Sequence, residues 1–389
     1  MGSGYGTHDL ALPSAEPIAS HSGLCIAVAS ASMDRATVDI YERSAAEYGD
    51  KRRAYRPDRA RTFADALPAG GWRLDLGCGP GHYLPHLGRP VVAGDAAVAM
   101  VAEARRRYGE VPGVACDLEA LPFRRGAVAG VWASKCLQHV APERLPLALA
   151  GLHRVLPVGG LLDVTMFAGD GVELTDDDDD FPGRRFTWWQ PERLHDVLVG
   201  AGFELDELRV ADPSWEHGRV VARARRARTL PDTVGPGMRM LVCGLNPSLY
   251  AADAGVGFAR PGNRFWPAAL AAGLVTVDRD ADHALWHHGV GMTDLVKRAT
   301  VAASELTGDE YRAGLERVEG LVRWLQPGAV CFVGLAGWRA AVDRRAQPGV
   351  QPTGLADVPI YVMPSTSGLN ARTSLDDLTE HLRSAAALP

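Results

Sequence analysis

The sequence predicts an α/β protein made of two doubly wound α/β/α domains, a larger sheet followed by a smaller parallel sheet. Three observations predict this fold class. Strand and helix patterns alternate over residues 38–224 and again over residues 238–389, as expected for parallel sheets covered by helices. In each half, a short apolar run ends in a glycine-containing turn, at Gly77–Gly81 and at Gly244–Pro247. Residues 225–237, between the halves, are rich in arginine, proline and glycine, which is typical of a linker.

Residues 1–37 are rich in serine, alanine and glycine and lack periodicity, so we expect this segment to be disordered. No basic stretch precedes the apolar run Leu24–Ala29, which argues against a signal peptide and makes Met33 an alternative start. The first domain then begins with a helical pattern. The elements predicted after it are strands at Trp72–Leu76, Val91–Gly94, Gly113–Cys116, Val128–Ala133 and Gly160–Phe167, helices at Val98–Tyr108, Arg144–Leu156 and Pro191–Gly202, and closing strands at Phe203–Ala211 and Arg219–Ala224.

The acidic run of residues 176–180 predicts a solvated loop. The second domain repeats the alternation on a smaller scale. Its predicted elements are strands at Met240–Cys243, Ala329–Val333 and Ile360–Met363, and helices at Arg264–Ala272, Gly308–Gln326, Gly337–Arg344 and Ser374–Ala387.

The composition narrows the class of protein. A chain of 389 residues with 47% hydrophobic and 23% charged residues is ordinary for a soluble protein of two or three domains. The net charge of −6 excludes a broadly basic surface, so any contact with nucleic acid must come from local arginines and backbone amides. Six scattered cysteines without a CxxC pair predict neither a metal site nor a disulfide framework. We therefore expect a cytoplasmic protein, associated with the nucleoid when it binds DNA.

The first glycine-rich turn lies between a strand and a helix, and it reads Leu-Asp-Leu-Gly-Cys-Gly-Pro-Gly from Leu74 to Gly81. The start of the following helix offers free N–H groups to a ligand. The next strand ends in Asp95, whose carboxylate can accept both hydroxyls of a ribose, and the third strand ends in Asp117. This combination resembles class I S-adenosylmethionine-dependent methyltransferases over residues 38–224.

The resemblance implies that the first domain binds S-adenosyl-L-methionine. Tyr48 either closes over this cofactor or only packs against the sheet. The sequence contains no Asn-Pro-Pro-Tyr-like motif, so the methyl acceptor stays open. The residues that the resemblance assigns to the cofactor are Asp75, which orients the loop, Gly77, Gly79 and Gly81 at the methionine part, Asp95 at the ribose, Asp117 near the adenine amine with Leu118 after it, and Ser134 at the methyl-transfer pocket.

The second domain carries two motifs at strand ends. One strand ends in Gly-Leu-Asn-Pro, which places Asn246 where open α/β sheets bind ligands, and Phe258 supplies an aromatic face nearby in the sequence. A later strand is followed by Pro-Ser-Thr-Ser-Gly-Leu-Asn-Ala-Arg, which ends at Arg372 and has Leu369 as its apolar tip. The two motifs closely resemble the mismatch-specific uracil/thymine-DNA glycosylases, a branch of the uracil-DNA glycosylase superfamily.

The resemblance implies a partner, double-stranded DNA with G·U or G·T mispairs, from which the damaged nucleotide is flipped out. It implies no metal and no cofactor for this half. The residues it assigns are Asn246, which positions the attacking water, Leu245, Ala251 and Phe258 in the base pocket, Leu369 as the wedge in the duplex, Gly368 and Asn370, whose backbones read the orphaned guanine, and Ser365, Ser367 and Arg372 at DNA phosphates.

Three further residues have simpler expected roles. Asn263 and Arg264 are expected to cap and start a helix. Lys297 is the only lysine of the second half and lies far in the sequence from both motifs, which argues against lyase chemistry through a Schiff base.

The leading hypothesis is a DNA glycosylase for base-excision repair, fused to a methyltransferase of unknown acceptor. The alternative is primarily a small-molecule or RNA methyltransferase whose second half only binds nucleic acid. A non-catalytic scaffold is a third hypothesis. Asn246 by itself is also compatible with a simple turn after a strand, and Leu369 with a buried loop residue.

Overall fold

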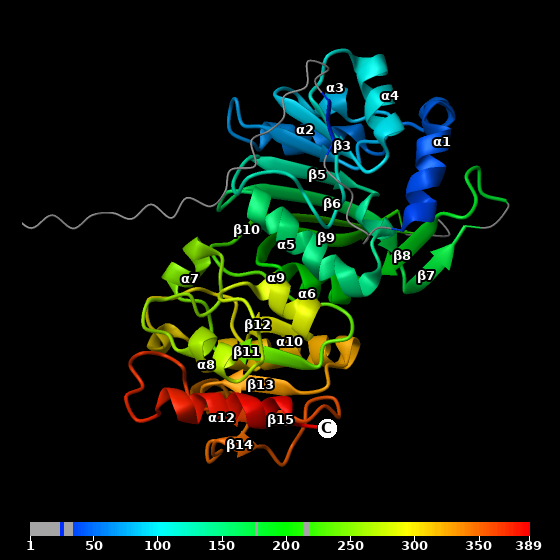
Figure 1. Cartoon of the computed structure of the whole chain (residues 1–389). Helices are drawn as coiled ribbons and strands as arrows, with labels where there is room; N and C mark the ends of the chain where they lie inside the picture. Colours follow the sequence, from blue (N-terminus) through cyan, green and yellow to red (C-terminus); the bar gives the residue numbers. More distant parts are fainter. Residues whose placement is uncertain (1–23, 27–33, 176–177, 213–217) are drawn as a thin grey trace, which may run out of the picture.

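The structure is a computed structural model that describes residues 24–26, 34–175, 178–212 and 218–389. It contains two sheets, which lie one above the other in Figure 1. None of the helices in the described ranges is long and apolar enough to cross a membrane.

The first sheet has ten strands, and most of them are parallel. The last two strands, β9 and β10, run antiparallel to their neighbours. In spatial order the strands are β1 (Leu24–Ile26), β4 (Gly113–Ala115), β3 (Val91–Asp95), β2 (Arg73–Leu76), β5 (Gly130–Ser134), β6 (Leu161–Ala168), β10 (Arg219–Arg226) and β9 (Phe203–Ala211), with β7 (Gly171–Leu174) and β8 (Arg185–Trp189) forming a hairpin beside β6.

Helices cover this sheet. α1 packs against α4, and α6 packs against β9. In Figure 1, α5 and α6 lie on the side that faces the second domain. The helices are α1 (Arg35–Lys51), α2 (Pro57–Asp65), α3 (Leu84–Leu87), α4 (Val98–Tyr108), α5 (Leu145–Val155) and α6 (Pro191–Gly200), with short 3₁₀ turns at Leu137–His139 and Pro142–Arg144.

The second sheet has five strands, and only the edge strand β14 is antiparallel. In spatial order the strands are β12 (Val290–Asp294), β11 (Met240–Gly244), β13 (Val330–Val333), β15 (Ile360–Met363) and β14 (Gly349–Val350). The helices around it are α7 (Leu249–Ala254), α8 (Phe265–Ala271), α9 (Ala281–His288), α10 (Gly308–Leu325), α11 (Leu335–Ala341) and α12 (Leu375–Ala386), with a 3₁₀ turn at Ala303–Glu305.

The central strand β11 is buried on both faces. Leu241 and Cys243 belong to one hydrophobic core, whereas Met240 and Val242 belong to another on the opposite face. Because successive side chains of a strand point to opposite faces, helices must cover both sides of this sheet. The predicted fold class, two α/β/α domains, is therefore confirmed.

The structure corrects part of the predicted disorder in residues 1–37. Leu24–Ile26 forms β1, which pairs with β4, and α1 already begins at Arg35. The rest of that prediction falls on residues 1–23 and 27–33, which lie outside the described residues. In the acidic run, Asp179 forms an ion pair with Arg184 and Asp180 one with Arg52, whereas residues 176–177 lie outside the described residues.

The connection between the sheets is packed against both domains. β10 continues to Arg226, and the following residues lie against the end of α6 and the middle of β12. The backbone N–H of Asp232 donates to the carbonyl of Gly200, and Thr233 exchanges two hydrogen bonds with Met292. The segment predicted as a linker, residues 225–237, therefore contacts both domains in this structure.

Candidate functional site

A cavity of about 140 Å³ opens at the carboxyl ends of β2, β3 and β5, where parallel sheets bind ligands. Five of the residues predicted from the sequence line it: Gly77, Gly79, Asp95, Leu118 and Ser134. The glycine-rich turn thus brings its backbone to the same space as the carboxylate of the second parallel strand.

Asp95 is held by backbone N–H groups. Its Oδ2 accepts from Gly79 at 2.8 Å and its Oδ1 accepts from Ala97 at 2.9 Å. A carboxylate offers about four lone-pair sites, so two remain for other donors, such as ribose hydroxyls. Burial raises the pKa of Asp95 to about 6, although these backbone hydrogen bonds act in the opposite direction.

The other predicted residues of this group lie outside the cavity lining. Asp75 is buried beneath the turn, and its Oδ2 has no hydrogen-bond partner among the described residues. Burial, and then the charge of Asp95, raise the pKa of Asp75 to about 8. Gly81 faces α3 and α4, where a Cβ atom would meet Leu84 at 2.8 Å. Asp117 accepts from the backbone of Glu119 at 2.9 Å and so stabilises its own turn.

Aromatic side chains from α1 complete the cavity wall, and the sequence patterns single out only Tyr48 among them. Tyr48 lies next to Gly79, because a Cβ atom added there would meet its ring at 4.0 Å. Tyr41 contacts His139, whose Nδ1 donates to the carbonyl of Arg185, so its Nε2 accepts from the Tyr41 hydroxyl at 3.0 Å. Burial lowers the pKa of His139 to about 4, which makes it a neutral wall residue.

In the second domain, Asn246 directly follows β11 and is fixed by its side-chain nitrogen. Nδ2 donates to the carbonyl of Arg298 at 2.9 Å, to Oγ1 of Thr300 at 2.8 Å and to the carbonyl of Pro247 at 3.2 Å. Backbone carbonyls can only accept, so the nitrogen must face them. The opposite end of the amide, Oδ1, is thereby oriented as an acceptor.

Of the predicted base-pocket residues, Leu245 directly follows β11 and Phe258 packs against its last residue, Gly244. Phe258 has a left-handed backbone with φ of 58° and stacks on Phe265, with ring centroids 4.2 Å apart. Its ring lies against Gly244, where a Cβ atom would meet Cζ at 3.4 Å. Ala251 is buried in α7, and the carbonyl of Leu245 already accepts from the backbone of Val296 at 2.9 Å.

The sequence patterns missed Asp294, the last residue of β12. In the register of the parallel pair it lies beside Gly244, and a Cβ atom on that glycine would meet its Oδ1 at 2.3 Å. A carboxyl group and the Phe258 ring therefore border the same backbone position. Burial raises the pKa of Asp294 to about 6. Asp294 is an acidic residue at a strand end, but the sequence shows this pattern only if β12 is first predicted as a strand.

The loop after β15 presents its apolar tip to solvent. Leu369 is 88% exposed, so it is not a buried loop residue in this structure. Asn370 holds the loop through its own Nδ2, which donates to the carbonyl of Ser365 at 2.8 Å. Gly368 comes close to Gly262, whose carbonyl would be 2.9 Å from an added Cβ atom. The two motif loops of the second domain therefore meet.

The hydroxyl groups of this loop serve its own backbone. Ser365 accepts from the N–H of Ser367, and Ser367 accepts from the N–H of Leu369, both at 3.3 Å. Arg372 is exposed, and its backbone N–H donates to Oδ1 of Asn370 at 3.4 Å. The three residues predicted to contact DNA phosphates therefore lie near the exposed loop tip, and Arg372 is open to solvent.

Arg264 was expected only to start a helix, but it ties this loop to the first motif. Its guanidinium donates to the carbonyls of Asn370 at 2.6 Å, Ser367 at 3.3 Å and Thr373. Its backbone N–H donates to Thr366 at 2.9 Å. The N-cap position of α8 is Arg264, so Asn263 lies one residue before the cap, where its Oδ1 accepts from the N–H of Phe265 at 2.9 Å.

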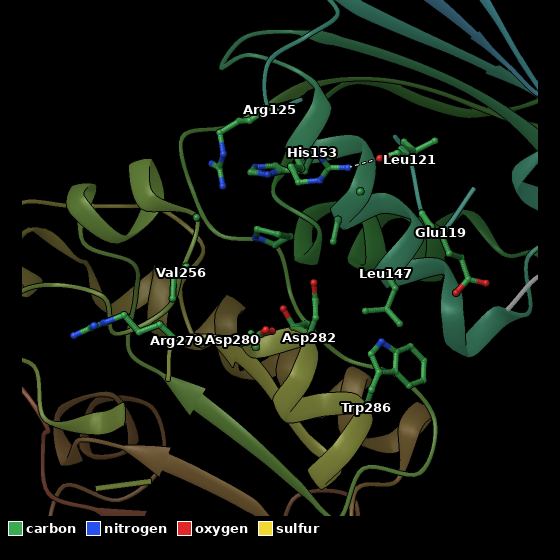
Figure 2. A pocket seen from close by; sticks show the side chains of 18 of the residues that line it. Glu119, Leu121, Arg125, Leu147, His153, Val256, Arg279, Asp280, Asp282 and Trp286 are labelled. Carbon is green, nitrogen blue, oxygen red and sulfur yellow. Dashed lines mark hydrogen bonds between the residues drawn. The ribbon is translucent and has the colours of Figure 1, made fainter. Parts of the chain in front are cut away.

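A larger cavity, of about 990 Å³, lies between the domains. Arg125 and His153 of the first domain line one wall, and Asp280 and Asp282 of the second domain lie across from them (Figure 2). The sequence-predicted site residues lie outside its lining. Its lining includes residues 119–121, which directly follow Leu118 of the first cavity, so one turn borders both spaces.

Comparison with protein families identifies the class of each domain. Residues 74–164 match the model of the methyltransferase domain, and residues 231–386 match that of the uracil DNA glycosylase superfamily. The chain is thus a fusion of a methyltransferase domain and a uracil DNA glycosylase superfamily domain.

Two solved structures illustrate the similarity to methyltransferases. The 1,6-didemethyltoxoflavin-N1-methyltransferase of Burkholderia thailandensis is 24% identical, with coverage of 52% of this chain and 92% of that chain and a TM-score of 0.39. A SAM-dependent methyltransferase from Methanosarcina mazei is 17% identical, with coverage of 45% of this chain and 100% of that chain and a TM-score of 0.39.

Proposed function

We propose that the second domain is a DNA glycosylase that removes uracil, or a related damaged base, from G·U and G·T mispairs in duplex DNA and leaves an abasic site. The observation that carries the proposal is the anchoring of Asn246. Its Nδ2 is used by three acceptors, which leaves Oδ1 as the end that positions water. An amide is a weak base, so this geometry suits a route in which the glycosidic bond is largely broken before water attacks.

The surroundings support the same reaction. The Phe258 ring supplies a face on which a flipped base stacks, together with the pocket residues Leu245 and Ala251. Leu369 is exposed at a loop tip, where it can enter the stack that the flipped nucleotide leaves. The backbones of Gly368 and Asn370 flank this wedge and read the orphaned guanine, while Ser365, Ser367 and Arg372 lie near the phosphates.

The first domain, in our proposal, uses S-adenosylmethionine as methyl donor. Asp95 accepts the ribose hydroxyls, Gly77 and Gly79 approach the methionine part, and Leu118 and Ser134 line the adenine and methyl-transfer ends. The open backbone at Gly79 and the remaining lone pairs of Asp95 fit this cofactor. Asp75 supports the glycine-rich turn from beneath, and Asp117 stabilises its own turn. Gly81 allows the turn to pack closely against α3 and α4.

The glycosylase proposal is tested with oligonucleotides that carry uracil opposite guanine, uracil opposite adenine, thymine opposite guanine, or uracil in a single strand. Alkaline cleavage of abasic sites reports excision. We expect the fastest excision at G·U, because the wedge and the reading of guanine both require a duplex. No excision from any substrate would reject the function, and equal rates in single strands and at G·U would reject the duplex scheme.

A further inference from the structure

The methyltransferase cavity contains an amine in an unusual position. Lys135 follows Ser134 at the end of β5 and lines the same cavity as Asp95. Its backbone is left-handed, with φ of 63°, and its N–H donates to the carbonyl of Thr165 at 2.8 Å. For a lysine this conformation is unfavourable, and the surrounding sheet must offset it.

The amine of Lys135 differs from those of the other two lysines of the chain. Lys51 forms ion pairs with Glu47 and Asp180 at the surface, and Lys297 forms a buried ion pair with Asp232. Within the described ranges, no carboxylate lies within ion-pairing distance of Nζ of Lys135. Nζ of Lys135 lies over the ring of Tyr55, 4.6 Å from its centroid.

The charges around Lys135 favour the neutral amine. Burial, then the guanidinium groups of Arg219 on β10 and Arg52 after α1, lower the pKa of Lys135 to about 8. The Tyr55 ring favours the ammonium, and Asp95 lines the same cavity. A bound sulfonium would add a positive charge to this space and favour the neutral form further.

We propose that Lys135 is the proton acceptor for methyl transfer in this cavity, and that the methyl acceptor is a compound with an N–H or O–H group. The inference rests on the proposed function of the first domain. The acceptor's proton passes to Nζ of Lys135, and the freed lone pair forms the bond to the methyl carbon. The carbon–sulfur bond breaks with its electrons on sulfur, so S-adenosylmethionine becomes S-adenosylhomocysteine.

This role explains why the position combines a strained backbone with an amine that lacks a counterion. A lysine that only anchored an anion would gain from staying charged, whereas a proton acceptor must be neutral in the complex. An amine that titrates near the working pH is suited to general base catalysis, which typically contributes about 10²–10⁴-fold to the rate.

The first experiment measures the affinities of S-adenosylmethionine and S-adenosylhomocysteine by calorimetry between pH 7 and 9. The amino groups of the two compounds titrate in the same way with either chain, so their contribution cancels when the wild type is compared with Lys135→Met. Because only the sulfonium is repelled by an ammonium, the ratio should favour S-adenosylmethionine up to about tenfold more at pH 9 than at pH 7. Lys135→Met should bind S-adenosylhomocysteine within about threefold of the wild type and lose this pH dependence.

A ratio with the same pH dependence in the wild-type chain and in Lys135→Met would overturn the role of Lys135. If the wild-type chain binds neither compound, the proposed function of the domain fails instead, so the two failures are distinguishable.

The second experiment uses the wild-type chain alone and does not depend on the folding of a variant. Competitive acetylation with trace acetic anhydride at a series of pH values, read by mass spectrometry, gives the titration midpoint of each lysine. We expect a midpoint near 8 for Lys135. Lys51 is the internal control, because its hydrogen bonds to Glu47 and Asp180 raise its pKa. A midpoint at or above that of Lys51, or no labelling at any pH, would contradict the proposal.

Discussion

At each of the two sites, one polar side chain is held in place by hydrogen bonds that leave part of its hydrogen-bonding capacity free. The side-chain nitrogen of Asn246 donates to Arg298, Thr300 and Pro247. The carboxylate of Asp95 accepts from backbone N–H groups. Such anchoring reduces the entropy lost when water or a hydroxyl group binds. The consequences can be measured one residue at a time.

Replacing the catalytic asparagine candidate separates chemistry from binding. Asn246→Ala should reduce excision from a G·U duplex by about 10²–10³-fold, the usual cost of losing one positioning and electrostatic contact. Affinity for the duplex should stay almost unchanged. Single-turnover kinetics and a binding titration on the same variant measure the two effects. Gln347→Ala, which removes an exposed amide that donates to the carbonyl of Arg345, is the matched control and should retain turnover.

Two results would refute this assignment of Asn246. Near wild-type turnover would mean that another residue positions the water. Loss of duplex binding together with turnover would mean that Asn246 is a structural turn residue.

The pH dependence of cofactor binding should report Asp95. Its pKa is raised to about 6, so the carboxylate is ionised above that pH and protonated below it. The ionised form accepts hydrogen bonds from the ribose hydroxyls. The affinity for S-adenosylhomocysteine should therefore be constant from pH 8 to 7 and fall about tenfold by pH 5. Calorimetry measures this curve. Asp95→Asn should bind at least about tenfold more weakly at pH 8 and lose the decline; a decline that persists in the variant would assign it to another group.

At the scale of elements, the sequence predicted those with strong periodicity. The strands Phe203–Ala211 and Ile360–Met363 have the predicted bounds, because residues typical of turns stand on both sides of each strand. β12 was missed because Gly291 and Asp294 weaken its strand signal, and with it the place of Asp294. α7 was missed because six residues are too few to show helical periodicity.

The same limit applies to contacts between distant elements. The sequence motifs place Leu369 in a loop and Arg264 at a helix start, but they do not show that the two are linked. That link requires the folded chain, since residues 264 and 370 meet only when α8 packs beside the loop after β15. Contacts of this kind depend on tertiary packing and have no local pattern.

The position of the wedge should depend on Arg264. Its guanidinium holds the carbonyls of three loop residues, and Arg264→Met removes this donor from all of them, although Ser367 still accepts from the N–H of Asn370. We expect excision at G·U to fall about tenfold, since each charged hydrogen bond contributes about 1.5–3 kcal/mol and the loop can partly relax. Arg323→Met, on the exposed side of α10, is the matched control and should have no effect.

A double-mutant cycle decides whether Arg264 acts through the wedge. Leu369→Ala should itself lower excision from duplexes. If Arg264 positions Leu369, adding Arg264→Met to that variant should cause little further loss. Independent, multiplicative losses would show that Arg264 serves another part of the site.

At the scale of the whole molecule, the two domains are joined by buried as well as exposed contacts. Trp189 of the first domain packs edge-on against Trp324 of the second, with centroids 6.1 Å apart. Arg125 of the first domain donates to the carbonyl of Ala254 at the end of α7 at 3.4 Å, and Arg144 lies over the ring of Trp286 at 4.5 Å. α7 begins three residues after Asn246, so the first domain contacts a helix close in sequence to the proposed glycosylase site.

A buried ion network centres on Asp232, whose backbone N–H donates to Gly200 of α6 and whose side chain contacts the second domain. Its side chain is 3% exposed and accepts from Lys297, Arg317 and Thr293, each at 2.7 Å. Burial alone would raise the pKa of Asp232, but Arg317 and Lys297 hold it below its usual value. The same contact occupies the amine of Lys297, which leaves it unsuited to Schiff-base chemistry.

Asp232→Ala should therefore destabilise the whole chain, because it leaves two buried cations without a counterion. Breaking a buried pair in this way typically costs about 3–5 kcal/mol in the free energy of unfolding. Urea denaturation, followed by tryptophan fluorescence, measures the loss. Asp253→Ala is the matched control, since it removes the exposed ion pair with Arg228 between the connecting segment and α7 and should leave the transition unchanged. Equal transitions for Asp232→Ala and the wild type would mean that the two domains are held together by their apolar contacts and not by this ion network.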